Sequence, residues 1–175
     1  MTCRMRRISR YLVFLIILSS LLVSCKFYSF TGADIDYNTT STFQVNYFRN
    51  EAPLVEPSVS RDFTDALQTL MLNQTSLSQT NAGGDLIFEG EIVEYYIAPI
   101  TATAEHTAAQ NRLTIAINVR FINTVNPEKD FERRFSHYFD YEGGAMLIGG
   151  QLSTATEEIF ERITQDIFNA SLANW

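Results

Sequence analysis

Cysteine, histidine and basic residues are scarce in this 175-residue chain, and each shortage excludes a class of function. The only cysteines are Cys3 and Cys25, too few for a disulfide framework or a cysteine metal cluster. The two histidines, His106 and His137, stand apart in the sequence without the clustered ligands of a metal site. No G-x-S-x-G elbow, P-loop or G-x-G-x-x-G pattern occurs. We therefore expect no enzyme, no cofactor and no metal.

Four of the basic residues are concentrated at the N-terminus. They are arginines, and they precede an apolar run over residues 11–23, which is shorter than the roughly 20 residues of a spanning helix. Leu22-Val23-Ser24-Cys25 then resembles the bacterial lipobox, in which the cysteine is acylated and becomes the first residue after cleavage. The pattern predicts a lipoprotein signal peptide over residues 1–24 and lipid attachment at Cys25. A plain signal peptide or a membrane anchor is the alternative.

The remaining chain is strongly acidic. The formal charge is −7, but residues 1–24 carry four arginines and no acid, so the mature chain has nine basic and 20 acidic side chains. Such a chain lacks the basic face that nucleic-acid binding requires. It is also poorly suited to lie on anionic lipid, so membrane affinity would come from the acyl chains. We expect a lipidated tether over residues 25–40 and a single domain over residues 41–175.

Apolar periodicity predicts four strands and two helices in that domain. Strands are expected at 43–47, 86–97 and 113–121, and a last strand is marked by Phe131, Phe135 and Phe139. In strand 86–97, one face would carry Leu86, Phe88 and Ile92, and the other Ile87, Val93, Tyr95 and Ile97. Helices are expected at 58–74 and from a capping box at Thr154-x-x-Glu157 nearly to the end of the chain. The last helix would begin with Glu157, Glu158 and Glu161 in its first two turns, where they complement the helix dipole.

This order of elements predicts an α+β fold. Consecutive strands joined by hairpins favour an antiparallel sheet, and two one-sided helices must cover one of its faces. We expect a two-layer sandwich with about four mainly antiparallel strands and both helices on one face. The connection between Ala98 and Asn111 is the longest inside the sheet, and loops of that length are often functional.

The basic side chains of the mature chain are the candidates for binding an anionic group. Arginine holds phosphate oxygens bidentately, and a basic neighbourhood is formed by Arg112, Arg120, Lys129, Arg133 and Arg134. The alternative is cross-strand pairing with Glu128, Glu132 and nearby acids. His137, between Ser136 and Tyr138, is expected to be a surface residue and not a catalytic base.

Seven short segments, in order, resemble the LptE family of lipopolysaccharide-assembly lipoproteins in its Bacteroidetes form. The likeness covers nearly all of the mature chain. Its segments are Cys25-Lys26-Phe27-Tyr28-Ser29-Phe30-Thr31-Gly32, Phe43-Gln44-Val45-Asn46-Tyr47-Phe48, Phe63-Thr64-Asp65-Ala66-Leu67, Asp85-Leu86-Ile87-Phe88-Glu89-Gly90, Asn111-Arg112-Leu113-Thr114-Ile115, Asp166-Ile167-Phe168-Asn169 and Ala173-Asn174-Trp175.

The resemblance implies a function and a partner. A protein of this family is lipid-anchored at the outer membrane, faces the periplasm, and plugs the lumen of the β-barrel translocon LptD. It assists barrel assembly and placement of lipopolysaccharide in the outer leaflet, without catalysis. Lipopolysaccharide binding in the family is associated with basic residues, from which this acidic chain departs. An accessory lipoprotein of another envelope lipid-transport system is the alternative.

Overall fold

The computed structural model describes residues 35–53, 56–100, 110–142 and 147–173. The predicted signal peptide and Cys25 lie outside these ranges. Within them the elements are β1 (Thr42–Val45), β2 (Arg49–Asn50), α2 (Val59–Gln74), β3 (Ser78–Gln79), β4 (Leu86–Ile100), β5 (Gln110–Asn123), the short 3-10 helix η2 (Pro127–Lys129), β6 (Phe131–Glu142) and α3 (Gly149–Leu172). Neither of the α-helices in these ranges has the length and apolar character to cross a membrane.

The sheet is mixed, in the order β3-β1-β4-β5-β6, with β2 also paired to β4. The α+β class is confirmed, but the prediction of about four mainly antiparallel strands is corrected to six strands with three parallel pairings. The reason is the connection between β1 and β4, which contains α2. A strand that returns through a helix pairs in parallel with its neighbour. Only β4, β5 and β6 follow one another as antiparallel hairpins.

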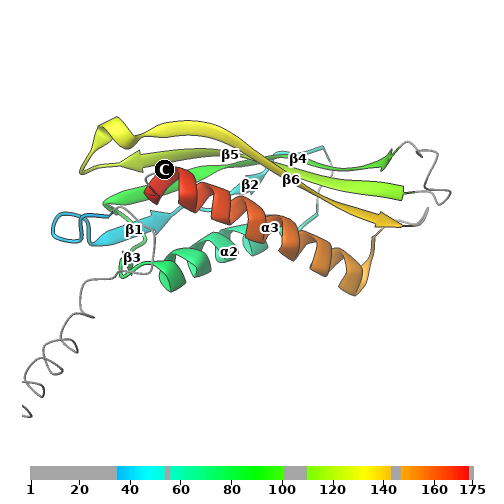
Figure 1. Ribbon diagram of the computed structural model, residues 1–175, viewed down its shortest axis with the longest axis horizontal. Coiled ribbons are helices and arrows are strands. Elements are labelled where there is room, and N and C mark those ends of the chain that lie inside the picture. Colours follow the sequence, from blue (N-terminus) through cyan, green and yellow to red (C-terminus); the bar gives the residue numbers. More distant parts are fainter. Residues whose placement is uncertain (1–34, 54–55, 101–109, 143–146, 174–175) are drawn as a thin grey trace, which may run out of the picture. The chain divides into compact units, whose positions relative to one another are not determined.

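Both helices lie on one face of the sheet, as expected, with α2 beneath the β1 side and α3 beneath β5 and β6 (Figure 1). The core between the layers is apolar and continuous. The sheet contributes Phe43, Phe88, Ile92, Leu113, Ile117 and Phe121, and the helices contribute Phe63, Leu67, Met71, Ile159, Ile163 and Ile167. Three aromatic rings connect the β1–β2 segment, α2 and α3. The ring centroid of Phe63 on α2 lies 5.0 Å from that of Phe48 and 5.3 Å from that of Phe160 on α3. Such edge-to-face pairs add to simple burial.

A β-bulge in β4 overturns the predicted faces of that strand. The register with β5 shifts between Ile92 and Glu94, so one extra residue enters β4. A bulge puts two residues of one strand opposite one of its partner, and the alternation changes phase. Tyr95 is therefore in the core, 3% exposed, and Ile97 packs against the core, on the face of Leu86 rather than the opposite one.

The last helix begins earlier than the capping box indicated. α3 starts at Gly149, with Ile148 before it in extended conformation, and the Thr154 hydroxyl donates to the Gly150 carbonyl inside the helix. Gly149 has a φ of 56°, in the region that favours glycine. Thr154 is therefore an interior residue, and the capping-box prediction is wrong. The predicted loop between Ala98 and Asn111 is also shorter, because β4 and β5 pair as far as Ile100 and Gln110, and residues 101–109 lie outside the described ranges.

Asp85 ties the start of β4 to the start of β1. Its carboxylate accepts hydrogen bonds from the backbone N–H of Ser41 at 2.8 Å and of Thr42 at 2.9 Å, and from both hydroxyls. Its backbone N–H donates to the Thr42 hydroxyl, and its carbonyl accepts from Thr124 after β5. These donors stabilise the ionised carboxylate, with the Ser41 N–H as the largest cause, and lower the pKa of Asp85.

Gly90 lies where a side chain would have no room, between the backbone of β5 and the ring of Phe48. A Cβ atom there would lie 2.0 Å from the Asn118 carbonyl oxygen and 2.8 Å from the Phe48 ring. The absence of a side chain at Gly90 therefore allows β4 to pair with β5 while Phe48 packs over it.

We expect Gly90→Ala to destabilise the domain by about 3 kcal/mol or more, because the added carbon meets backbone as well as a ring. Chemical denaturation of the purified chain measures this. Gly150→Ala is the matched control, since a Cβ there meets nothing within 4 Å. Equal stability of the two variants would contradict the close approach.

We expect Asp85→Asn to lower the free energy of unfolding at pH 7. Because the folded-state pKa of Asp85 lies below its unfolded value, its ionised form stabilises the fold above that unfolded value, and the benefit is lost as the pH falls through the folded pKa. The difference from wild type should shrink below about pH 4. Denaturation at several pH values measures it. Asp65→Asn is the control, and a gap independent of pH would reject the carboxylate role.

Candidate functional site

The histidine on β6 makes a hydrogen bond to a carboxylate of α3 and belongs to no catalytic triad among the described residues. His137 Nε2 lies 2.8 Å from Asp166 Oδ2 on α3 and so links the sheet edge to the helix. Ser136 and Tyr138, its chain neighbours, point to the other face of the strand, because successive strand residues alternate. His106 lies outside the described ranges. In the described part, no three His, Cys, Asp or Glu side chains come together in a way that could hold a metal ion.

Three of the five predicted basic residues lie on the sheet face away from the helices, each with a carboxylate. Arg112 pairs with Asp140 at 2.6 Å, Arg134 with Glu94 at 2.5 Å and Arg120 with Glu89 at 3.3 Å. These three arginines are therefore paired across strands, which is the alternative that the sequence left open. The partners are not Glu128 and Glu132, which sequence proximity had suggested.

Arg112 is the most constrained of the three. Its guanidinium donates two hydrogen bonds to the Asp140 carboxylate, at 2.6 and 2.8 Å, and stacks 3.6 Å above the centre of the Tyr138 ring. The hydrogen bond from Arg112 is the main cause that lowers the pKa of Asp140. A planar guanidinium held by a bidentate carboxylate and an aromatic face loses little freedom when it meets another ligand.

Lys129 and Arg133 lie apart from these three. Lys129 ends the short helix η2 in the turn between β5 and β6. Arg133 is opposite the core residue Val119, on the helix-side row of β6, and its guanidinium lies 5.5 Å from the Phe131 ring. Along β5, Arg112 and Arg120 are about 27 Å apart at 3.4 Å per residue. The structure therefore spreads the five basic residues over two faces and both ends of the sheet.

Exposed tyrosines accompany Arg112 on the open face. Thr114 of β5 is flanked by Tyr96 on β4 and Tyr138 on β6, and both rings are 46% exposed. Local periodicity does not predict this row, because the bulge in β4 changes the side on which Tyr96 lies relative to the first half of that strand. Only the paired register of all three strands reveals it.

Comparison with known proteins assigns the family. The model of the LptE family, described as lipopolysaccharide-assembly, matches residues 40–171, about three quarters of the chain. No curated protein matches the sequence. Among solved structures, the chain is similar to the hypothetical protein CT253 from Chlamydia trachomatis, with 10% identity, a TM-score of 0.48, and coverage of 77% of this chain and 99% of that one.

A second solved structure with a similar fold is the rare lipoprotein B from Shewanella oneidensis. It is 9% identical, with a TM-score of 0.45, and the match covers 73% of this chain and 89% of that one. Both structural likenesses are low, so the assignment depends on the sequence model, which spans the domain from Thr40, before β1, to Ser171 at the end of α3. The chain belongs to the LptE family of lipopolysaccharide-assembly lipoproteins, which are not enzymes.

Proposed function

We propose that this lipoprotein is anchored in the outer membrane through Cys25, faces the periplasm, and plugs the LptD β-barrel while it assists lipopolysaccharide insertion. The observation that carries the proposal is the family match over residues 40–171. The lipobox at residues 22–25 supports the anchor, and the short apolar run before it supports export without a spanning helix.

The long hairpin of β4 and β5 supports the plug role. Pairing of β4 with β5 continues to Ile100 and Gln110, and Gln110 also pairs with Glu142 of β6, so residues 101–109 connect two paired strand ends at this end of the sheet. Those nine residues are small or polar, with Glu105 as the only acid, and a segment without large apolar side chains suits a wet barrel interior. We propose that the barrel lumen receives this end of the sheet.

The five basic residues remain our proposed contacts for the phosphates of lipopolysaccharide. They are Arg112, Arg120, Lys129, Arg133 and Arg134. For the three that are already paired, a phosphate would have to replace or share a carboxylate, which lowers the gain in binding free energy. Arg133, which stacks near Phe131 instead, is therefore the strongest of the five.

Affinity purification tests the partner. With a C-terminal tag and mild detergent, we expect an outer-membrane barrel of translocon size in near-equal amount, together with lipopolysaccharide. We expect this barrel to be largely lost when residues 101–109 are replaced by Asn-Gly, a two-residue turn that joins paired strand ends without strain.

Two controls accompany the shortened loop. Thermal unfolding should match that of the wild type, because the replaced residues join strands that already pair. A Gly/Ser segment of equal length separates the effect of length from that of side chains. Undiminished barrel recovery with the two-residue turn would reject the loop's role, and recovery of inner-membrane transporter subunits would favour another lipid-transport system.

For lipopolysaccharide itself, we expect Arg133→Gln to weaken binding by roughly tenfold or more, the effect of one charge-assisted hydrogen bond. Binding of purified lipopolysaccharide to the detergent-solubilised protein measures this. Arg61→Gln is the matched control, since Arg61 on α2 pairs with Asp62 and lies among acidic residues. Equal affinity of both variants would remove Arg133 from the proposed contacts.

A further inference from the structure

A groove lies between α2 and α3. It encloses about 640 Å³, and its lining comes from the two helices and the turn before α2, with no strand residue. Figure 1 shows the two helices side by side beneath the sheet, so the groove is a seam of the helical layer. Neither the family assignment nor the proposed plug role assigns a function to this groove.

The groove has an apolar floor. Its apolar lining residues are Val59, Ala66, Leu70, Leu152 and Phe160. Ala66, Leu70 and Leu152 are only partly buried, although they pack against the core. A segment that covered them would remove further apolar surface from water, which favours the complex.

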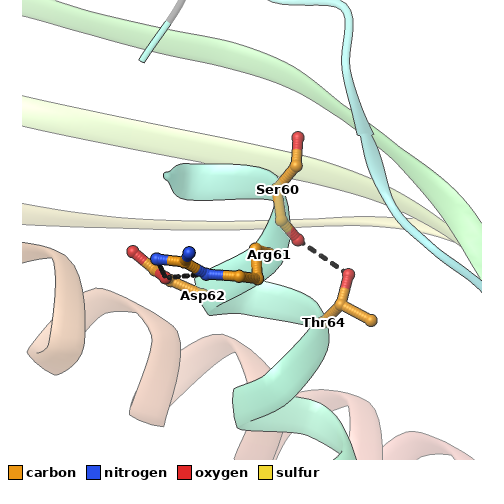
Figure 2. Close-up of polar contacts among 4 residues, drawn as sticks. All are labelled: Ser60, Arg61, Asp62 and Thr64. Atoms are coloured by element: carbon orange, nitrogen blue, oxygen red, sulfur yellow. Dashed lines mark hydrogen bonds and ion pairs between the residues drawn. The ribbon is translucent and has the colours of Figure 1, made fainter. Parts of the chain in front are cut away.

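Carboxylates surround this floor. The lining includes Glu56, Asp62, Asp65, Glu157 and Glu161 but no lysine, arginine or histidine. Asp62 is already paired with Arg61 at 3.1 Å, on the first turn of α2 where Thr64 also donates to the Ser60 carbonyl (Figure 2). Asp65 and Glu157, one on each helix, make no hydrogen bond or ion pair with any described residue.

Folding alone does not account for these acids. Because α3 begins at Gly149, Glu157 is its ninth residue and Glu161 its thirteenth. The helix dipole acts within about the first turn, so the dipole explanation expected from the sequence does not apply to them. Instead, like charges line both sides of one groove, an arrangement that costs free energy in the isolated domain.

We propose that the groove between α2 and α3 binds a cationic amphipathic segment of a partner protein. Its apolar side chains cover the floor, and its Lys or Arg side chains pair with Asp65 and Glu157. The chemistry excludes other occupants. A second copy of this acidic chain would add like charge, and anionic lipid or nucleic acid would be repelled.

Site-specific photo-crosslinking of the full chain in its own host cells tests the proposal. A photoreactive amino acid at Thr69 or Asn73, both exposed and in the groove, leaves every carboxylate in place. We expect adducts that map by mass spectrometry to a protein segment rich in Lys or Arg and apolar residues. The same probe at the exposed Tyr47 should give no adduct with that segment.

Charge reversal supplies the matched comparison. Asp65→Lys combined with Glu157→Lys should reduce the adduct roughly tenfold or more, because two attractions become repulsions. Glu128→Lys combined with Glu132→Lys changes the net charge equally near the β5–β6 turn and should leave it unchanged. Thermal unfolding confirms that both variants are folded.

Each other outcome overturns the inference. No adduct from either groove position would mean that nothing docks there. An adduct with lipid, with a second copy of the chain, or with a segment lacking basic residues would assign the groove to a different occupant. An adduct whose yield does not respond to the reversal of Asp65 and Glu157 would show that their charges do not recognise the partner.

Discussion

Burial of one apolar sheet face beneath two helices is the constraint on which the rest of this domain depends. The three long strands β4, β5 and β6 supply most of that face, and α2 and α3 cover it. Because the chain passes through α2 between β1 and β4, β4 returns to the sheet in parallel with β1. The Asp85 carboxylate then fixes the start of this parallel pair, and Gly90 lets Phe48 close over it.

The charges of the domain follow from the same division into layers. On the open face of the sheet, arginines and carboxylates lie on adjacent strands and neutralise one another, as Arg112 and Asp140 do. On the helical layer, Asp65 and Glu157 face a groove without cations. The charges on the open face of the sheet are thus paired with one another, whereas the negative charges of the groove between α2 and α3 are not. The unbalanced surface is the one that can discriminate between partners by sign of charge.

The sequence alone was sufficient for the family, for the two helices, and for the strands whose apolar positions alternate cleanly, such as Leu113, Ile115 and Ile117. The sequence did not predict features that leave no trace in the local spacing of apolar residues. The bulge after Ile92 changes the phase of β4, so Tyr95 was expected on the wrong face. The start of α3 was missed because paired glycines there indicate a loop, although Gly149 uses its freedom to enter the helix. The carboxylate partner of each arginine is determined by the register between adjacent strands, and the sequence of one strand does not contain that register.

The free edge of β6 exposes the domain to aggregation through its sheet. β6 ends the sheet, and no described strand pairs with its outer side, so alternate residues along this 12-residue strand present backbone donors and acceptors to neighbouring molecules. Such an unpaired edge is a template for pairing with a strand of another molecule, which favours edge-to-edge aggregation. Glu132, Arg134 and Asp140 along this strand act as gatekeepers, because a second strand would have to desolvate or oppose their charges before it could add to the sheet.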